Sequence, residues 1–369
     1  MIDVSNKKNV GRQNELDVAR GLAVIFMVLI HMLLELSNRS TQEESIYGIL
    51  TQLLGGVPAA PVFMFLLGVG IIYSRKNTPG LLVKRGLTLV AAGYILNLFR
   101  SVIPAWINTF LGFESPVAVS NLVYENLFYI DILQFAGLAM LFFAVSLYFN
   151  FSIREYMLVL LLFMIFNLFM LPYIPYYEAT AVAPFTALLF GNDFSYFPFF
   201  TWIAYPIGGY LFGTYLIQTG NKFEFYKRVF KVTSIILVAY SVCVVLFNFP
   251  TGYESDSSYY HHTIIVNLVY ILFILFWISI LYFISNKLHG LGWTFLKSAS
   301  ALTTEIYFIH FLFIGLYAVL IHQKLGLGST LLLTVLTYVF SHYMAYLFVK
   351  LKANKINHRQ ERPPLKENS

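Results

Sequence analysis

Charged residues and cysteine are scarce in this chain. Only 11% of its 369 residues are charged, while 58% are hydrophobic; a soluble domain carries about 25% charged residues. Cys243 is the single cysteine, so the chain can form neither an internal disulfide framework nor a cysteine-based metal site. The low charge excludes an ordinary soluble domain and is typical of an integral membrane protein.

Long apolar runs fill most of the chain. Because a membrane-spanning helix needs roughly 20 apolar residues, the sequence predicts an all-α, polytopic bundle of about ten transmembrane helices. We place them at 17–36, 48–74, 84–103, 127–149, 155–173, 196–217, 230–249, 264–284, 298–321 and 328–350. The connections 104–126 and 173–195 are long enough to hold re-entrant or interfacial helices. The first run has no small-residue cleavage signal, so we interpret it as a retained helix rather than a signal peptide.

Basic residues fall almost entirely on alternate connections. We assign 21 of the 24 lysines and arginines to one side, and only Arg39, Arg100 and Lys324 to the other. Since cytoplasmic loops retain Lys and Arg, both termini are expected in the cytoplasm, with the protein in the plasma membrane. The net charge of +6 is spread over six cytoplasmic segments, which favours contact with membrane lipids over nucleic acid.

This topology predicts three parts. Residues 1–14 form a cytoplasmic segment, residues 15–351 the transmembrane domain, and residues 352–369 a polar tail that we expect to be disordered.

Polar residues within the spans are few, and such residues mark function by default. Arg20 and His31 are eleven positions apart, which is three helical turns, so they share one face roughly 16 Å apart. Asp17 and Glu35 extend this stripe at its two ends. Asp17 and Arg20 are also explained as anchors of the helix end; His31, well inside the span, is not needed for anchoring.

A late span carries a second polar group. Tyr307 and His310 are neighbours at i,i+3, whereas Glu305 lies about 140° away from His310 and needs another partner. Asp131 and Gln134 are further intramembrane polar residues. Two histidines on different spans can converge on one reaction centre, where an imidazole accepts a proton from a hydroxyl or amine.

Alternatives remain for the histidines. His31 and His310 can instead make two structural interhelical hydrogen bonds. We expect no metal, because no carboxylate shares the spacing of either histidine. His261 and His262, adjacent in an outer loop, are interpreted as solvated surface.

A basic cluster lies at the second inner connection. It consists of Arg75, Lys76, Lys84 and Arg85. Membrane topology explains some of these cations, but four beside Arg20 also suit the phosphates of a polyanionic cofactor.

Several segments together resemble a known superfamily. The spacing of Arg20 and His31 is similar to the Arg-X10-His signature of the membrane acyltransferase-3 family, and Tyr307 with His310 to its late Tyr-X2-His segment. Other stretches resemble the related heparan-α-glucosaminide N-acetyltransferase group; these are Pro61–Val69, Asp131–Leu138 and Tyr196–Ile203 with Gly208, Gly209 and Gly213. In that group the position of His31 is typically Asn, and His310 matches the catalytic histidine.

The resemblance implies an acyl-CoA-dependent acyltransferase, most often an acetyltransferase, that acts in polysaccharide modification. CoA phosphates would meet Arg20, Arg75, Lys76, Lys84 and Arg85 on the cytoplasmic side. One of His31 and His310 would act as general base on an extracytoplasmic saccharide or amine, and Tyr307 would assist. His310→Ala is then expected to abolish turnover in a folded protein.

Two other classes of function stay open. A secondary transporter or glycan exporter would use the buried His, Asp and Glu as a proton relay, and a membrane scaffold would use none of them. The sequence does not choose between O- and N-acylation, and a homodimer is compatible with it. Tyr259 and Tyr260 suit either stacking on sugar faces or anchoring at the membrane interface.

Overall fold

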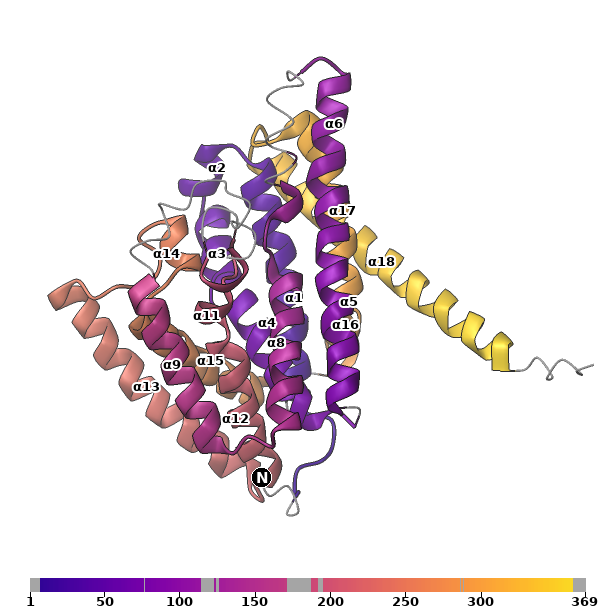
Figure 1. Ribbon diagram of the computed structural model, residues 1–369. Coiled ribbons are helices and arrows are strands. Elements are labelled where there is room, and N and C mark those ends of the chain that lie inside the picture. The colour runs from indigo at the N-terminus through magenta and orange to yellow at the C-terminus, as the bar shows by residue number, and fades with distance from the viewer. Residues whose placement is uncertain are drawn as a thin grey trace, which may run out of the picture.

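The computed structural model describes residues 7–75, 77–113, 123, 126–170, 187–191, 195–285, 287 and 289–360. Within these residues the regular secondary structure is helical, and β-pairing is limited to two isolated bridges, Ser37 with Leu325 and Ile130 with Ser195. Figure 1 shows the helices as an elongated bundle. The predicted all-α architecture is therefore confirmed for the described part of the chain.

Seven stretches of helix in the described residues are long and apolar enough to cross a membrane. These are α1 (Asn14–Leu36), α3 with α4 (Ile46–Gly55 and Ala60–Tyr73), α5 with η1 and α6 (Pro79–Asn97, Leu98–Val102 and Ile103–Phe110), α13 (Lys222–Phe247), α15 (Ile264–Ser285), α17 (Thr303–Ile321) and α18 (Leu327–Gln360).

The other three expected spans are occupied by shorter helices. They are α8 (Ile132–Tyr148), α9 (Ile153–Met170) and α12 (Ala204–Gln218), the last preceded by the single turn α11 (Phe199–Trp202). At 1.5 Å per residue, the 15 residues of α12 extend about 22 Å, less than the roughly 30 Å hydrocarbon layer. Neither the count of ten spans nor the cytoplasmic location of the termini is settled by the fold, and both stay predictions.

Helix α1 lies at the centre of the bundle and packs against α3, α4, α15, α16 (Gly290–Ala301), α17 and α18. Two further helix pairs, α5 with α8 and α4 with α12, pack closely along their lengths. Fourteen of the 23 residues of α1 are buried, and even the acidic Glu15 at its start is enclosed by Lys222 and Tyr226. A helix enclosed on most sides can carry polar groups through the membrane without exposing them to lipid.

Glycines permit the closest helix contact in the core. A β-carbon on Gly68 of α4 would stand 1.9 Å from the Pro206 carbonyl oxygen, and one on Gly209 of α12 would stand 1.8 Å from that of Phe65. Neither position has room for a side chain, so the backbones of α4 and α12 approach directly. Such small-residue contacts are a main means by which helices associate in membranes.

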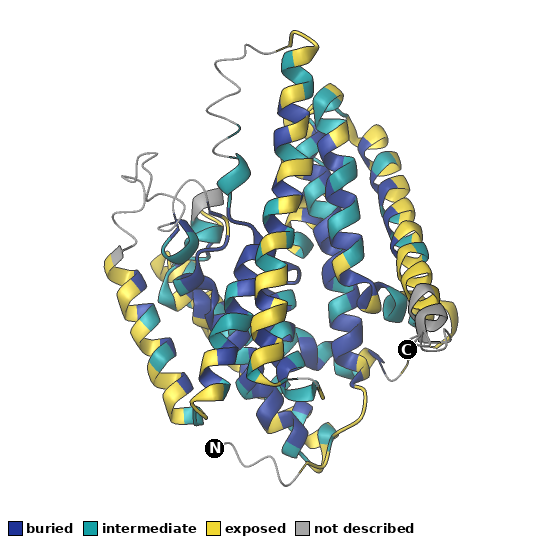
Figure 2. Ribbon diagram, turned by 45° about the vertical axis from the view of Figure 1, so that its right-hand side comes forward, coloured by how far each residue is buried: buried dark blue, intermediate teal, exposed yellow. Residues whose placement is uncertain are grey.

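The outermost helices present apolar side chains outward, as the exposed colouring in Figure 2 shows for the peripheral helices. Only 6% of the most apolar window of α13 is buried, and only 22% of that of α18. In water such surfaces would be strongly unfavourable, so lipid is their natural environment.

Helix α18 extends past the predicted start of the tail. The helix continues to Gln360, whereas the disordered tail was predicted from residue 352. Residues 352–360 contain neither glycine nor proline, so nothing in them interrupts a helix that α18 has already started. Residues 361–369 lie outside the described residues.

Candidate active site

His31 of α1 and His310 of α17 are in direct contact. His31 Nδ1 lies 2.9 Å from His310 Nε2, and the two rings are nearly parallel, with 5.2 Å between their centroids. His310 is fully buried, and Phe311 packs on both rings at 4.5 and 4.4 Å between centroids. The structure thus brings together two histidines that the sequence analysis placed on separate spans.

The neighbours of His310 fix the direction of this hydrogen bond. His310 Nδ1 lies 3.1 Å from the carbonyl oxygen of Ile306, which can only accept, so Nδ1 carries the proton. In the neutral ring Nε2 is then an acceptor, and it receives the Nδ1 proton of His31. The remaining nitrogen of His31, Nε2, is left with a lone pair, as a general base requires.

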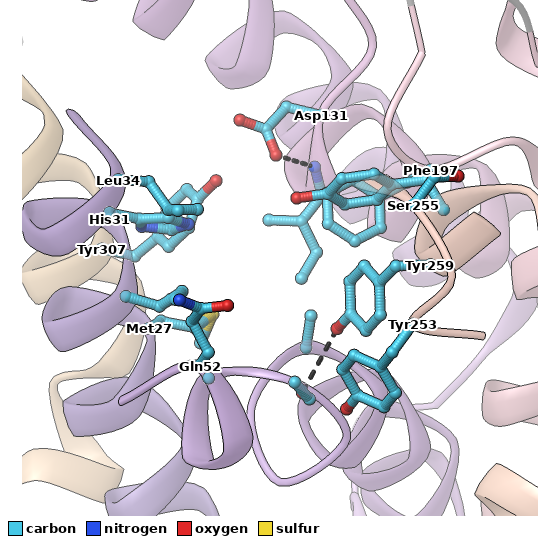
Figure 3. Close-up of a pocket in the computed structure, with 16 residues that line it drawn as sticks. Met27, His31, Leu34, Gln52, Asp131, Phe197, Tyr253, Ser255, Tyr259 and Tyr307 are labelled. Carbon is cyan, nitrogen blue, oxygen red and sulfur yellow. Dashed lines mark hydrogen bonds between the residues drawn. The ribbon is translucent and has the colours of Figure 1, made fainter. Parts of the chain in front are cut away.

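Two cavities adjoin at His31. One has a volume of about 210 Å³ and the other about 550 Å³. Five residues border both, and these are His31, Leu34, Asp131, Phe197 and Tyr260. Figure 3 shows the smaller cavity with His31 and Tyr307 on one wall and Asp131, Phe197 and Tyr259 across from them. Of the two histidines, His31 borders the cavities and His310 lies behind it.

Arg100 and Asp131 form a buried ion pair beside His31. Arg100 Nη1 donates to Asp131 Oδ2, both side chains are nearly inaccessible, and the guanidinium lies 4.7 Å from the centroid of the Phe311 ring. Arg100 sits in the π-helical turn η1, and such turns occur frequently at functional sites. Sequence reasoning placed Arg100 at the outer end of a span and gave it no role; the signal was an arginine within an apolar stretch.

Tyr307 lies against both histidines. Its ring is 6.4 Å from that of His31 and 5.5 Å from that of His310, each nearly perpendicular. The side chain is buried, borders the smaller cavity, and its hydroxyl lies near Asp131 without a regular hydrogen bond within the described residues. A buried hydroxyl without a regular hydrogen bond is costly, so it is available to a group that enters the cavity.

The comparison with known proteins bears on this constellation. The family model for the heparan-alpha-glucosaminide N-acetyltransferase catalytic domain matches residues 12–239, which is more than half of the chain. The chain belongs to this family. The match supports the resemblance to the heparan-α-glucosaminide N-acetyltransferase group. It does not support the resemblance to the acyltransferase-3 family. No curated protein and no solved structure matches the chain.

The region that matches the family model contains only part of the site. The matched region includes His31, Arg100 and Asp131, but it ends before Tyr307 and His310. The contact of α17 with α1 therefore comes from the structure alone.

Gln134 and Glu35 have different surroundings from those of the histidines. Gln134 completes a capping box with Asp131 at the start of α8, and its amide donates to the Tyr129 carbonyl, so it stabilises the helix start. Glu35 lies at the rim of the larger cavity, 43% exposed, with its carboxylate 3.6 Å from His322 Nδ1.

Glu305 lies in the first turn of α17, where the helix dipole favours a carboxylate. Within the described residues it forms no ion pair, so the partner expected from the sequence is not found there.

Arg20, one of the basic residues expected to hold phosphates, lies towards the other end of α1 from His31. Arg20 Nη1 is 3.8 Å from Asp17 Oδ1, and Arg12 also donates to Asp17. Asp17 further accepts from Ser300 at 3.3 Å, which ties α1 to α16. The Asp17 carboxylate therefore holds the Arg20 guanidinium at the N-terminal end of the polar stripe.

Of the other four phosphate candidates, the structure describes three. Lys84 and Arg85, in the first turns of α5, are exposed, as is Arg75 before it. Among the described residues none of these three is in an ion pair with an acid, which leaves their charges available. Lys76 lies outside the described residues.

The interpretation of His262 as solvated surface was wrong. Its side chain is only 2% exposed, because the loop before α15 folds inward against Trp202 and Tyr205. Burial lowers the pKa of His262 to about 4. Burial also lowers the pKa of the half-buried His261 to about 4, with a smaller contribution from His262. His261 and His262 are adjacent in a loop, and nothing in the sequence indicates which of two such histidines is buried.

Proposed function

We propose that this protein transfers an acyl group, most simply acetyl, from cytoplasmic acyl-CoA to a hydroxyl or amine of an extracytoplasmic saccharide. The observation that carries the proposal is the His31–His310 pair at the junction of two cavities, beside the buried Arg100–Asp131 pair. Membership of the heparan-alpha-glucosaminide N-acetyltransferase family supports acetyl transfer to nitrogen.

We give His31 the role of general base, which is supported by its place on both cavities and its hydrogen bond to His310. Its Nε2 would accept the proton of the attacking hydroxyl or amine as that atom bonds to the carbonyl carbon of the thioester. The carbon–sulfur bond then breaks, and the same proton passes from His31 to the departing sulfur, which gives the acylated acceptor and free CoA thiol. His310 accepts the Nδ1 proton of His31 throughout and keeps the ring in one orientation.

The surrounding groups have matching tasks. Tyr307 can donate its hydroxyl to the thioester carbonyl or to the acceptor. Asp131 borders both cavities with His31, so its carboxylate would stabilise the imidazolium formed when His31 takes the proton. On the cytoplasmic side, Arg20, Arg75, Lys76, Lys84 and Arg85 would hold the CoA phosphates. The roughly 16 Å between Arg20 and His31 along α1 is the distance that the pantetheine arm would follow.

The first test is the binding of acetyl-CoA to the purified protein in nanodiscs, with dephospho-CoA as the control. We expect saturable binding that weakens when Arg20 or Arg85 is replaced by glutamine. Absence of binding by a folded protein would move the assignment to transport, for which the same buried charges would serve as a proton relay.

The second test is transfer of labelled acetyl to glucosamine or glucose, which offer an amine and hydroxyls. His31→Ala should lower the turnover rate by about 10²- to 10⁴-fold, the usual contribution of a general base. His289→Ala, at an exposed position before α16, is the matched control and should keep the wild-type rate. Transfer that survives His31→Ala would remove His31 from catalysis.

A further inference from the structure

The cavity wall opposite His31 is formed by tyrosines of the connection between α13 and α15. Tyr253 and Tyr259 border the smaller cavity, and Tyr260 borders both cavities. Figure 3 shows Tyr253 and Tyr259 across the cavity from His31. Tyrosine rings offer both a flat apolar face and a hydroxyl, the combination that suits a sugar ring with its alternating apolar face and polar edge.

Two buried rings hold the backbone of this wall from behind. His262 Nδ1 donates to the Tyr259 carbonyl oxygen at 2.7 Å, and Trp202 Nε1 donates to the Tyr260 carbonyl oxygen at 2.8 Å. Two consecutive carbonyl groups are thus fixed by separate elements, α11 and the segment before α15. Trp202 is fully buried and His262 nearly so, which makes both donors rigid.

The His262 ring is also held at its second nitrogen, Nε2. Because the Tyr259 carbonyl can only accept, the proton is on Nδ1, and Nε2 accepts from the Tyr205 hydroxyl at 2.6 Å. Asn267 Oδ1 lies 2.9 Å from the same nitrogen, and since both atoms are acceptors when the ring is neutral, this is a packing contact; the Asn267 amide nitrogen donates to the Thr201 carbonyl. Helices α12 and α15 therefore both set the orientation of His262.

The hydroxyl groups of two wall tyrosines are hydrogen-bonded to the turn between α3 and α4. The Tyr259 hydroxyl donates to the Gly56 carbonyl at 3.2 Å, and the Tyr253 hydroxyl accepts from the Val57 amide at 3.2 Å. Any movement of the Tyr259 backbone would therefore change the width of the cavity between this wall and His31.

We propose that His262 is a positioning residue for the wall formed by Tyr253, Tyr259 and Tyr260, and through this wall for the saccharide acceptor of the reaction. His262 does not border either cavity, so it acts on the acceptor only through the backbone of Tyr259. The link to the acceptor rests on the proposed function, while the positioning of the wall does not.

The test compares His262→Leu, which removes both ring hydrogen bonds, with His262→Asn, whose amide nitrogen occupies nearly the place of Nδ1. With glucosamine as the acceptor probe, His262→Leu should raise the KM for glucosamine about tenfold, the value of one lost hydrogen bond. The KM for acetyl-CoA and kcat should stay unchanged, and His262→Asn should restore most of the KM for glucosamine. The neighbouring His261→Asn is the control and should behave as the wild type.

Hydrogen exchange of peptides covering residues 251–262 tests the wall without any acceptor. Exchange should rise in His262→Leu and return towards the wild-type rate in His262→Asn, with unchanged exchange in α1 and α17. Unaltered exchange in His262→Leu would overturn the proposal, as would an equal loss in kcat and in both KM values. If exchange rises but the wild type acetylates no acceptor, the positioning stands and the acyltransferase assignment fails.

Discussion

Gly315 of α17 lies directly against the backbone of Arg100. A β-carbon at Gly315 would stand 2.7 Å from the Arg100 carbonyl oxygen and 2.9 Å from its Cα. The π-helical turn that presents Arg100 to Asp131 therefore depends on the absence of a side chain one helix away. The contact connects the ion pair to the helix that carries His310.

Gly315→Ala is expected to displace the turn Leu98–Val102 and to separate Arg100 from Asp131. The overpacking should lower the free energy of unfolding by about 1–3 kcal/mol and should reduce acetyl transfer strongly. Unfolding in detergent and the transfer rate are the measurements. Gly70→Ala in α4, where an added β-carbon meets nothing within 4 Å, should leave both unchanged. Wild-type behaviour of Gly315→Ala would show that η1 is not held by this contact.

Asp131→Asn should be more harmful to stability than removal of both charges of the pair. The single change leaves Arg100 buried without its carboxylate, which costs about 3–5 kcal/mol. The double variant Arg100→Gln with Asp131→Asn avoids the unpaired charge and should regain much of the lost free energy of unfolding, but not activity. If the two proteins are equally unstable, the ion pair is not what makes Asp131 important.

His310 is expected to act by positioning His31 rather than by touching the acceptor. His310→Ala removes the acceptor of the His31 Nδ1 proton, so kcat should fall at least about 10²-fold, while the affinity for acetyl-CoA is retained. His310→Gln offers a side-chain oxygen to the same proton and should recover part of kcat. Failure of the glutamine variant to exceed alanine, with both folded, would favour direct chemistry at His310.

Acid should destabilise the wild type more than His262→Asn. The folded-state pKa of His262 is about 4, against about 6.5 in the unfolded chain. Above pH 6.5 both states are neutral and the full stability is present. As the pH falls from 6.5 towards 4, only the unfolded chain binds the proton, so stability is lost across that window.

The free energy of unfolding of the wild type, relative to that of His262→Asn, should therefore fall by about 2 kcal/mol between pH 7 and pH 5. His261, whose pKa burial also lowers, is present in both proteins and cancels in the difference. Denaturant unfolding at each pH is the measurement, and a constant difference between the two proteins would contradict the buried neutral state of His262.

Helical periodicity was enough to place Arg20, His31 and Glu35 on one stripe of α1, because a single straight helix determines that geometry. The possible convergence of His31 and His310 could be foreseen because polar residues within membrane spans avoid lipid. The partner of Asp131 was not predictable in this way, since the position of Arg100 depends on the packing of α5 against α8 and of η1 against α17. The apolar pattern did not predict the lengths of these helices either, because α8 begins at Ile132 and α12 at Ala204, several residues after the start of the runs 127–149 and 196–217.

The burial of His262 illustrates the same limit at the scale of one residue. Its surroundings come from Trp202, Tyr205 and Tyr259, and two of these belong to elements some sixty residues earlier. Local composition around His261 and His262 is polar and aromatic, which suits a loop at the membrane surface as well as a buried network.

The candidate base and its partner are separated by 279 positions along the chain. At a synthesis rate of about 5–20 residues per second, roughly 15 to 55 seconds pass between the emergence of His31 and that of His310. During this interval α1 already lies in the translocation machinery or the bilayer, and His31 lacks its partner. Biogenesis must therefore shelter His31 until α17 has been made, and a ribosome-arrested fragment ending before α17 should be retained by insertion factors and inactive.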